Sequence, residues 1–473
     1  MWIVPVIRRA SWCALVAVCA LACGSSASGP ARSSAKAVLS FSFLEANNPI
    51  PVDSVATISG TSIQAFLPPG TDVSALSPSF TISPKASASV GGRAQTSGAS
   101  AQNYSLPVTF TVTAEDGSTQ SYTVVVTTDI AAFDDAVTAF MTKYGVPGAS
   151  IAVTHAEKLV YLKTYGKQDE TQPVSQASLF RLASVSKTIT SIAIFELVEQ
   201  GKLQLSDTVF GAAGILGTTY GTQPYGPHIT EITVDELLHH TSGGWPNDAS
   251  DPMFSNPSMT AAQLISWTLD NRPLGNVPGT AYAYSNFGFF VLGRVIEQVT
   301  GLDYETAVKT LVLQPLGITD MTIGGNTLAD RLPGEVQYFG QSGEDPYAFN
   351  LHRMDANGGW IATARDLAVL LVHVDGFPSK PDILSAQSIS TMTTPSSANA
   401  NYACGWAVNS ANNWWHIGSL PGTETEIIRA AIGWNWVILV NSRSTQASYA
   451  NDLDQLFWTA HGQLAAYPDY DLF

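Results

Sequence analysis

Ser184-Val185-Ser186-Lys187 is followed at once by an apolar run over residues 188–198. On a helix, a serine and a lysine three positions apart lie about one turn apart on the same face. The lysine amine can then take the proton of the serine, which turns a weak hydroxyl into a nucleophile. A serine at the N-terminus of that helix also has unpaired backbone N–H groups nearby, which stabilise an oxyanion.

The S-x-x-K spacing occurs a second time, at Ser33-Ser34-Ala35-Lys36, in a polar stretch that no helix pattern follows. The spacing alone is therefore a weak signal. The structural interpretation of Ser184 and Lys187 is a helix-capping serine beside a solvated lysine. The sequence around the motif has to decide between the two interpretations.

Length and composition describe a globular chain of more than one domain. It has 473 residues, of which 45% are hydrophobic and only 13% are charged, which is enough apolar material for a large core. The formal net charge of −16 argues against nucleic acid as a partner, because binding it needs clustered lysine and arginine. The acidity itself favours solubility, with a cationic substrate as the minor alternative.

The N-terminus has the pattern of an export signal. Arg8 and Arg9 precede an apolar run over residues 10–22, which is short for a permanent membrane span. Small residues surround Cys23, which resembles the lipidation site of a bacterial lipoprotein. We therefore expect an exported cell-envelope protein that is anchored to the membrane through lipidated Cys23. Ordinary cleavage within residues 26–31, giving a periplasmic or secreted protein, is the alternative.

The cysteines agree with this expectation. Cys13 and Cys19 fall in the predicted signal peptide, residues 1–22, and Cys23 would carry lipid. Only Cys404 remains, so the mature protein is predicted to have no internal disulfide. No activating motif surrounds Cys404, which favours a buried, unreactive thiol over a nucleophile.

The first domain is predicted to be a small β-sandwich over residues 37–128, after a Ser/Ala/Gly-rich tether at 23–36. Short runs of alternating hydrophobicity have strand character at 39–43, 108–112 and 122–126. Asp116-Gly117 joins the last two runs in a predicted hairpin. The pattern resembles bacterial immunoglobulin-like modules of surface proteins. Because it holds no catalytic cluster, a spacer is favoured over an adhesive module.

The second domain, residues 129–473, begins with a predicted amphipathic helix at 130–144. Strand character occurs near both ends of the domain, at 149–153, 159–164, 404–408, 414–417, 424–431 and 434–441. A final helix is expected over about 444–462. This order predicts an α+β fold, in which one sheet is built from both ends and the middle is mostly helical.

Two further motifs follow Ser184 in order. Tyr284-Ser285-Asn286 begins 100 residues after Ser184, and His416-Ile417-Gly418 begins 132 residues after Tyr284. Each triplet is weak alone, and Tyr449-Ala450-Asn451 also fits the second pattern. Their order and spacing together are the stronger signal.

With these motifs the chain resembles the β-lactamase-related serine hydrolases: class C β-lactamases, D-alanyl-D-alanine carboxypeptidases and related esterases and D-aminopeptidases. The resemblance covers residues 133–461. It includes the flanking segments Phe180-Arg181-Leu182-Ala183, Leu237-Leu238-His239-His240-Thr241-Ser242-Gly243, Pro278-Gly279-Thr280, Pro315-Leu316-Gly317-Ile318 and Thr363-Ala364-Arg365-Asp366-Leu367. It implies the β-lactamase/penicillin-binding-protein-like fold, an antiparallel sheet flanked by helices.

The resemblance also implies a mechanism that needs no cofactor or metal. Ser184 attacks a carbonyl and forms an acyl-enzyme, which water then hydrolyses. Lys187 and Tyr284 share the general-base work, and a nearby ammonium would lower the pKa of the tyrosine. The structural alternative for Tyr284 is a core side chain.

The remaining site residues bind substrate by the same resemblance. Asn286 hydrogen-bonds Lys187 and the substrate amide, with a turn asparagine as the alternative. The backbone N–H groups of Ser184 and Ser419 form the oxyanion hole. Gly418 and His416 belong to the third motif, in which many relatives carry a lysine at the position of His416.

The histidine at this position changes the expected chemistry. A lysine offers a permanent positive charge to a substrate carboxylate, whereas a histidine is mostly neutral near pH 7 and offers a directional hydrogen bond. His416 therefore favours esterase or peptidase activity over an efficient β-lactamase. Its structural alternative is a histidine satisfied within a strand.

A zinc site at His228, His239 and His240 is not expected, because no carboxylate completes a known ligand spacing.

Two classes of function remain. The favoured one is a cell-envelope serine hydrolase acting on a small-molecule, peptide or ester substrate, either an esterase or a D-amino-acid peptidase or carboxypeptidase, with a class C-like β-lactamase as the alternative. The other class is a non-catalytic, surface-anchored binding protein that uses the fold as a scaffold. The presence of Ser184, Lys187, Tyr284 and Asn286 favours the enzyme.

Overall fold

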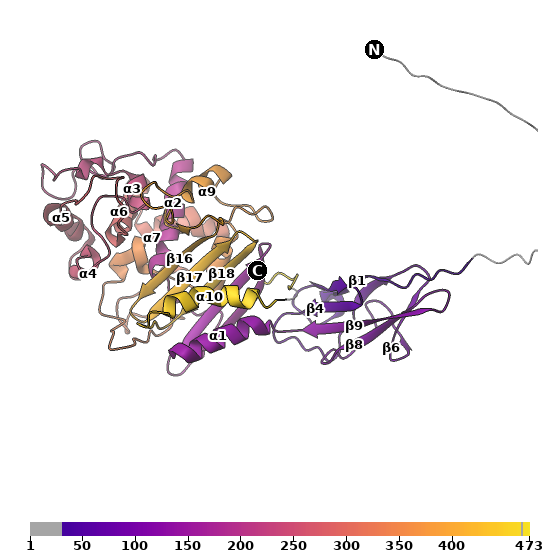
Figure 1. Cartoon of the computed structure of the whole chain (residues 1–473). Helices are drawn as coiled ribbons and strands as arrows, with labels where there is room; N and C mark the ends of the chain where they lie inside the picture. Colours follow the sequence, from indigo (N-terminus) through magenta and orange to yellow (C-terminus); the bar gives the residue numbers. More distant parts are fainter. Residues whose placement is uncertain (1–30, 465–466) are drawn as a thin grey trace, which may run out of the picture.

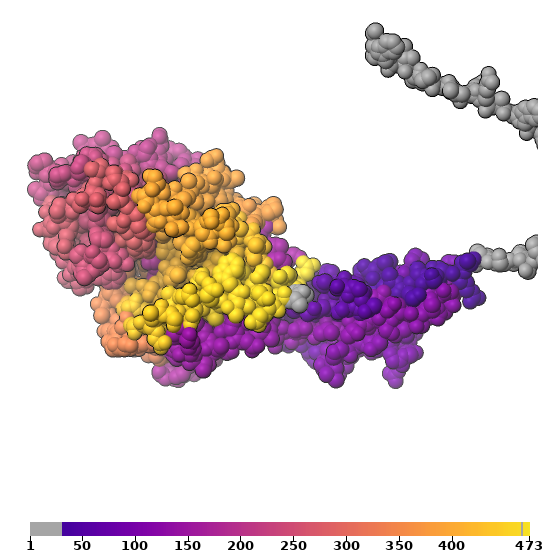
Figure 2. All heavy atoms as spheres, viewed as in Figure 1, coloured from indigo at the N-terminus to yellow at the C-terminus, as the bar shows by residue number. Residues whose placement is uncertain are grey.

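The computed structural model describes residues 31–464 and 467–473. The predicted signal peptide and Cys23 lie outside the described residues. Figures 1 and 2 show a smaller, strand-rich part that projects from a larger part of strands and helices. Across the described residues, no helix combines the length and the apolar composition that crossing a bilayer requires.

The smaller part consists of two sheets that share one apolar core. The first sheet has the order β2-β1-β5 and the second the order β3-β4-β9-β8-β6-β7. The strands are β1 (Val38–Phe43), β2 (Ser54–Val55), β3 (Thr57–Ser59), β4 (Ser62–Phe66), β5 (Ser79–Ile82), β6 (Ser87–Val90), β7 (Arg93–Ala94), β8 (Val108–Thr113) and β9 (Thr119–Thr127). Phe41 of β1 meets Phe110 of β8 edge to face at 5.6 Å, which joins the two sheets through their buried faces.

The hairpin predicted at Asp116-Gly117 is confirmed. Strands β8 and β9 pair antiparallel on either side of it, and Gly117 has a φ of 86°, a conformation that glycine adopts without the steric cost of a Cβ. Residues 128–130 then lead directly into the larger part, where Ile130 is buried in the core.

The main sheet of the larger part is antiparallel and has the order β11-β10-β18-β17-β16-β15. The strands are β10 (Gly148–His155), β11 (Lys158–Gly166), β15 (Ala407–Val408), β16 (Trp414–Leu420), β17 (Thr423–Ala430) and β18 (Trp434–Val440). Strand β10 pairs with β18, for example Ala152 with Val437, so the sheet is built from both ends of the domain as predicted. The α+β prediction and the β-lactamase-like fold are confirmed.

The strand predicted at 404–408 is wrong except at its end. Only Ala407–Val408 form a strand, because Cys404 and Gly405 belong to a turn that passes close to the helix carrying Lys187. Gly405 has a φ of 75°, and a Cβ there would lie 3.0 Å from the carbonyl oxygen of Lys187. Cys404 is buried, as expected.

Two helices cover one face of this sheet, α1 (Ala131–Tyr144) and α10 (Tyr449–His461) (Figure 1). Phe133 of α1 stacks on Trp436 of β18 at 5.7 Å, and Phe457 of α10 lies 5.7 Å from the same tryptophan. Helix α10 begins five residues later than the predicted start at 444, since residues 444–448 form no helix in the structure.

The middle region is mostly helical, as predicted, and it covers the other face of the sheet. Its helices are α2 (Ser186–Glu199), α3 (Val234–Leu238), α4 (Pro252–Ser255), α5 (Ala261–Asn271), α6 (Asn286–Thr300), α7 (Tyr304–Val308), α8 (Ala364–Leu371) and α9 (Ala386–Met392). A small sheet of order β12-β14-β13 lies among them, formed by β12 (Phe180–Arg181), β13 (Thr322–Ile323) and β14 (Trp360–Ala362). Helix α2 is buried from Ser186 to Phe195, which fixes its position relative to every neighbour.

Candidate active site

Ser184 lies in a single 3₁₀ turn, Ala183–Val185, directly before α2 rather than within that helix. It is partly exposed, whereas all other residues from Ser178 to Phe195 are buried. Ala183 has a φ of 46°, a left-handed conformation that costs a residue with a Cβ on the order of 1 kcal/mol or more. The surrounding packing holds this turn in a shape that presents the serine hydroxyl to solvent.

Lys187 is fully buried beside that hydroxyl. Its Nζ lies 3.1 Å from Ser184 Oγ, 2.8 Å from Asn286 Oδ1 and 2.8 Å from the carbonyl oxygen of Asn357. Burial lowers the pKa of Lys187 to about 7, against the opposing charge of Asp251. A large fraction of the amine is therefore neutral near pH 7. Its two N–H groups can donate to Asn286 and Asn357, which leaves the lone pair for the Ser184 hydroxyl.

Tyr284 packs against the same amine. Lys187 Nζ lies 5.0 Å from the centroid of its ring, and the side chain is half-buried. We expected a nearby ammonium to lower the pKa of this tyrosine, and this expectation is wrong. Burial raises the pKa of Tyr284 above its usual value, and the hydrogen bond with Ser184 offsets only part of the rise. The phenol is therefore protonated at neutral pH and can donate a proton.

Asn286 begins α6, and the preceding Ser285 caps that helix by accepting from the N–H of Gly288 at 3.0 Å. The side chain of Asn286 contacts both Lys187 and Asp251. Oδ1 accepts from Lys187, and Nδ2 donates to Asp251 Oδ2 at 2.8 Å. Sequence reasoning missed Asp251, because it precedes Asn286 by 35 residues in a loop without a motif. Its only local signal is Asp-Pro, which indicates a helix cap.

His416 is buried within a chain of hydrogen bonds. Its Nδ1 donates to the carbonyl oxygen of Ile417 at 2.8 Å, so its Nε2 accepts from the Tyr402 hydroxyl at 3.0 Å. His240 Nε2 in turn donates to that hydroxyl at 3.1 Å, and His240 Nδ1 accepts from the N–H of Ser285 at 3.1 Å. Burial, with the Lys187 charge, lowers the pKa of His416 to about 3. The imidazole is neutral, and both ring nitrogens are occupied inside the protein.

Gly418 brings strand β16 against the nucleophile turn. A Cβ at this position would lie 2.0 Å from the carbonyl oxygen of Leu182 and 3.0 Å from the backbone nitrogen of Ser184. The hydroxyl of Thr425, on β17, donates to the same Leu182 oxygen at 2.8 Å and fixes the approach. The backbones of Ser184 and of the third motif therefore lie side by side, as an oxyanion hole requires.

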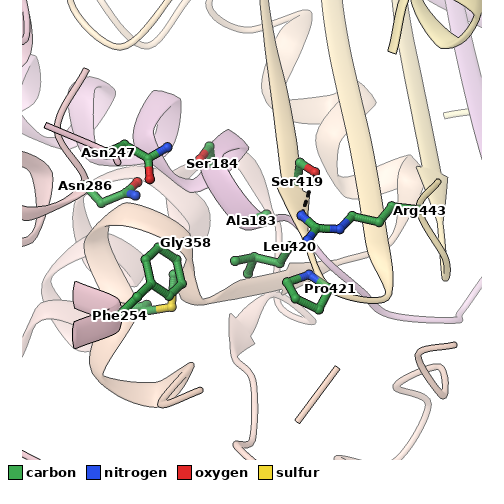
Figure 3. Close-up of a pocket in the computed structure, with 11 residues that line it drawn as sticks. Ala183, Ser184, Asn247, Phe254, Asn286, Gly358, Ser419, Leu420, Pro421 and Arg443 are labelled. Carbon is green, nitrogen blue, oxygen red and sulfur yellow. Dashed lines mark hydrogen bonds between the residues drawn. The ribbon is translucent and has the colours of Figure 1, made fainter. Parts of the chain in front are cut away.

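Ser184 faces a cavity of about 490 Å³. Figure 3 shows Ser184, Asn286 and Asn247 on one side and Ser419 with Arg443 on the other. Phe254, Met354 and Leu420 supply apolar lining. Of the predicted site residues, Ser184, Asn286 and Ser419 line this cavity, whereas Lys187 lies behind Ser184 and His416 is enclosed. A polar centre with an apolar wall suits a small organic substrate.

Arg443 is a cavity residue that the sequence did not indicate. Its Nη1 donates to Ser419 Oγ at 3.2 Å, and its Nε donates to Glu344 at 3.0 Å. Glu424 lies nearby on β17, where burial raises the pKa of its carboxyl to about 7. Arg443 thus places a permanent positive charge in the cavity, partly balanced by carboxylates.

One group of possible metal ligands occurs in the described residues: Asp235, His239 and Cys404, with ligand atoms within 4.8 Å of one another. His239 already contacts Asp235 through Nδ1 and the carbonyl oxygen of Thr394 through Nε2. Burial raises the pKa of the Cys404 thiol, which keeps it protonated. Cys404 Sγ also lies 3.5 Å from His239 Nε2, so the three side chains form one contact group.

The hydrogen-bond chain around His416 predicts a stability effect. Tyr402→Phe removes the hydroxyl that joins His240 and His416, leaving a donor and an acceptor buried without partners. We expect the free energy of unfolding to fall by about 2 kcal/mol, measured by urea denaturation. The half-buried Tyr220→Phe is the control, with an expected change of less than about 0.5 kcal/mol. An equal fall in the free energy of unfolding for the two substitutions would contradict this chain of hydrogen bonds.

Comparison with known proteins identifies the family. The chain matches the family model described as Beta-lactamase over residues 133–457 and a second model, described as SGBP, N-terminal, over residues 38–126. A putative D-alanyl-D-alanine carboxypeptidase of Escherichia coli O157:H7 is 26% identical over 336 residues, which cover 63% of this chain and 75% of that protein.

Solved structures share the fold. The D-amino acid amidase from Ochrobactrum anthropi SV3, complexed with D-phenylalanine, has a TM-score of 0.58 at 22% identity, covering 71% of this chain and 99% of the amidase. A class C β-lactamase has a TM-score of 0.58 at 19% identity, covering 72% of this chain and 97% of the β-lactamase. The chain belongs to the Beta-lactamase family and is a serine hydrolase.

Proposed function

We propose that the protein hydrolyses an ester or amide of small size through an acyl-enzyme on Ser184. One observation carries this proposal: the buried Lys187 amine faces the Ser184 hydroxyl at 3.1 Å while two acceptors hold its N–H groups. In the neutral amine the lone pair faces the hydroxyl, so a base is positioned before substrate arrives.

The proposed steps follow from this arrangement. Lys187 takes the Ser184 proton as Oγ bonds to the substrate carbonyl carbon. The backbone N–H groups of Ser184 and Ser419 stabilise the oxyanion. The leaving group departs with the proton that Lys187 took from Ser184, passed directly or through the Tyr284 phenol, which is protonated again by Lys187. Water then attacks the acyl-enzyme while Lys187 takes one of its protons, and Lys187 returns that proton to Ser184 Oγ as the acid product leaves.

We propose a D-amino-acid peptide, amide or ester as the substrate. The names of two similar proteins, a putative D-alanyl-D-alanine carboxypeptidase and a D-amino acid amidase, describe activity on such compounds. Arg443 supports a substrate with a carboxylate, because it is the cation that lines the cavity across from Ser184. This charge would do part of what the lysine of the third motif does in many relatives.

The class C-like β-lactamase remains the second candidate, and the shared fold favours it. Against it stands His416, which is neutral and has both ring nitrogens occupied. The non-catalytic alternative lacks comparable support, because Ser184, Lys187 and Asn286 are all present and in contact.

We further propose an exported, cell-envelope enzyme, lipid-anchored at Cys23, in which the first domain is an immunoglobulin-like spacer. Small residues around Cys23 support the anchor. All aromatic side chains in residues 37–128 are buried or half-buried, which favours a spacer over a surface that binds partners through exposed rings. The short link at 128–130 suits a fixed spacing between the domains.

Ser184→Ala tests the nucleophile. It removes the attacking oxygen, so turnover of p-nitrophenyl butyrate by the purified protein should fall about 1,000-fold or more. Ser33→Ala, in the other S-x-x-K sequence, should leave turnover unchanged. Turnover of the ester but not of a chromogenic cephalosporin supports the esterase or peptidase assignment, and cephalosporin turnover supports the β-lactamase. Near-normal turnover by Ser184→Ala would rule out the mechanism.

Gly418→Ala tests the oxyanion hole. The new Cβ would lie 2.0 Å from the Leu182 carbonyl oxygen, so β16 must move away from Ser184. Ester turnover should fall by at least about 100-fold, as when an oxyanion donor is lost. Gly226→Ala is the control, since a Cβ at that exposed position meets nothing within 4 Å. Equal turnover by the two variants would show that this close approach is not required.

Arg443→Gln tests carboxylate recognition. Glutamine keeps a polar side chain but carries no charge and is too short to reach Ser419 as Nη1 of Arg443 does. The KM for an acyl-D-alanyl-D-alanine peptide should rise about tenfold, whereas that for the neutral p-nitrophenyl butyrate should stay the same. Arg93→Gln, in the first domain, is the control. A rise of the same size for both substrates would contradict a carboxylate contact.

A further inference from the structure

Asp251 is a buried carboxylate that contacts the catalytic network from a loop of the helical region. Its side chain is 1% exposed. Oδ2 accepts from Asn286 Nδ2 at 2.8 Å, and Oδ1 accepts from the N–H of Met253 at 2.8 Å at the start of α4. The Asn286 amide lies between this carboxylate and the amine of Lys187, because it donates to Asp251 and accepts from Lys187.

We propose that Asp251 is a positioning residue for the hydrolysis reaction: it fixes the orientation of the Asn286 amide and, through that amide, supplies the negative charge that faces Lys187. This inference rests on the proposed function, because it assigns a role within the same site.

The orientation follows from donors and acceptors. An amide has a carbonyl oxygen that only accepts and an NH₂ group that only donates. A carboxylate accepts and never donates, so Asp251 holds the NH₂ of Asn286 toward itself. The oxygen must then face Lys187, where it accepts an N–H at 2.8 Å. With the amide reversed, its NH₂ would face the amine and its oxygen would face the carboxylate, and both contacts would be lost.

The charge follows from the groups that surround Lys187. Ser184 lies in the turn directly before α2, the helix that carries Lys187. Asn286 lies on α6, and the Asn357 carbonyl belongs to the turn before β14. The rings of Tyr284 and Phe289 lie 5.0 and 5.9 Å from Nζ. The titratable neighbours His240 and His416 are neutral, since burial lowers the pKa of each.

Asp251 is the charged group that favours the protonated amine of Lys187. Burial lowers the pKa of Lys187, and the Asp251 carboxylate limits that fall to about 7. Removing the charge while keeping the hydrogen bonds should therefore lower the pKa of Lys187 further. Because the neutral amine is the active form, kcat/KM should then rise at a lower pH than in the unsubstituted protein.

The simpler role for Asp251 is a cap for the short helix α4. Asparagine has one acceptor oxygen where aspartate has two, so Asp251→Asn removes the charge and keeps only one of the contacts with Met253 and Asn286. Asp251→Ala removes the charge and both contacts, so a shift of the acidic limb that the two variants share reports the charge.

The test is the pH dependence of kcat/KM for p-nitrophenyl butyrate in the unsubstituted protein, Asp251→Asn and Asp251→Ala. The unsubstituted protein should show an acidic limb near pH 7, and Asp251→Asn should shift it down by about one pH unit. Asp251→Ala should also lose kcat by about tenfold or more, because Asn286 can then rotate. Asp248→Asn, an exposed carboxylate of the same loop, should shift nothing.

A fluorophosphonate separates this inference from the proposed function. Ser184 Oγ bonds to phosphorus, fluoride leaves, and the serine proton passes to Lys187. If Ser184 of the unsubstituted protein is not labelled, the proposed function fails and the inference fails with it. A second outcome is that Ser184 is labelled while the acidic limbs of labelling and of turnover lie at the same pH in Asp251→Asn as in the unsubstituted protein. That result would overturn the inference alone. An unmoved limb with a lowered thermal midpoint in Asp251→Ala would leave Asp251 only its role as a cap.

Discussion

The site depends on the burial of one amine. Lys187 lies in the core with two acceptors at 2.8 Å and the Ser184 oxygen at 3.1 Å. Burial disfavours the charged amine and brings its pKa to about 7, so a base is available near neutral pH. The acceptors fix the direction of its lone pair. The almost completely buried helix α2 holds Lys187, and the 3₁₀ turn directly before it holds Ser184.

A second constraint is the close approach of β16 to the nucleophile turn. The left-handed conformation of Ala183, the missing side chain of Gly418 and the hydroxyl of Thr425 together bring two backbones side by side. The sheet that supplies β16 is completed by β10, from the start of the domain. Both ends of the domain must therefore fold together before Ser184 and Ser419 can meet around one substrate oxygen.

Sequence reasoning predicted the local motifs and a sheet built from both ends of the domain, because both depend on short spacings and on hydrophobic patterns. It missed Asp251 and Arg443, whose partners Asn286 and Glu344 lie 35 and 99 residues away. It also misjudged Tyr284, since burial of the ring raises its pKa and cannot be read from spacing. The strand expected at Cys404 became a turn for a related reason: contact with α2, rather than β-propensity, decides its conformation.

The most direct measurement is peptide mapping by mass spectrometry after an acid quench during turnover of p-nitrophenyl acetate. The account predicts one acetyl group on the peptide that contains Ser184, seen during turnover and lost once the ester is consumed. Deacetylation should also be slower below the pKa of Lys187, because water needs the same base. Turnover with no acetyl group on Ser184, or with acetylation at another residue, would contradict the account.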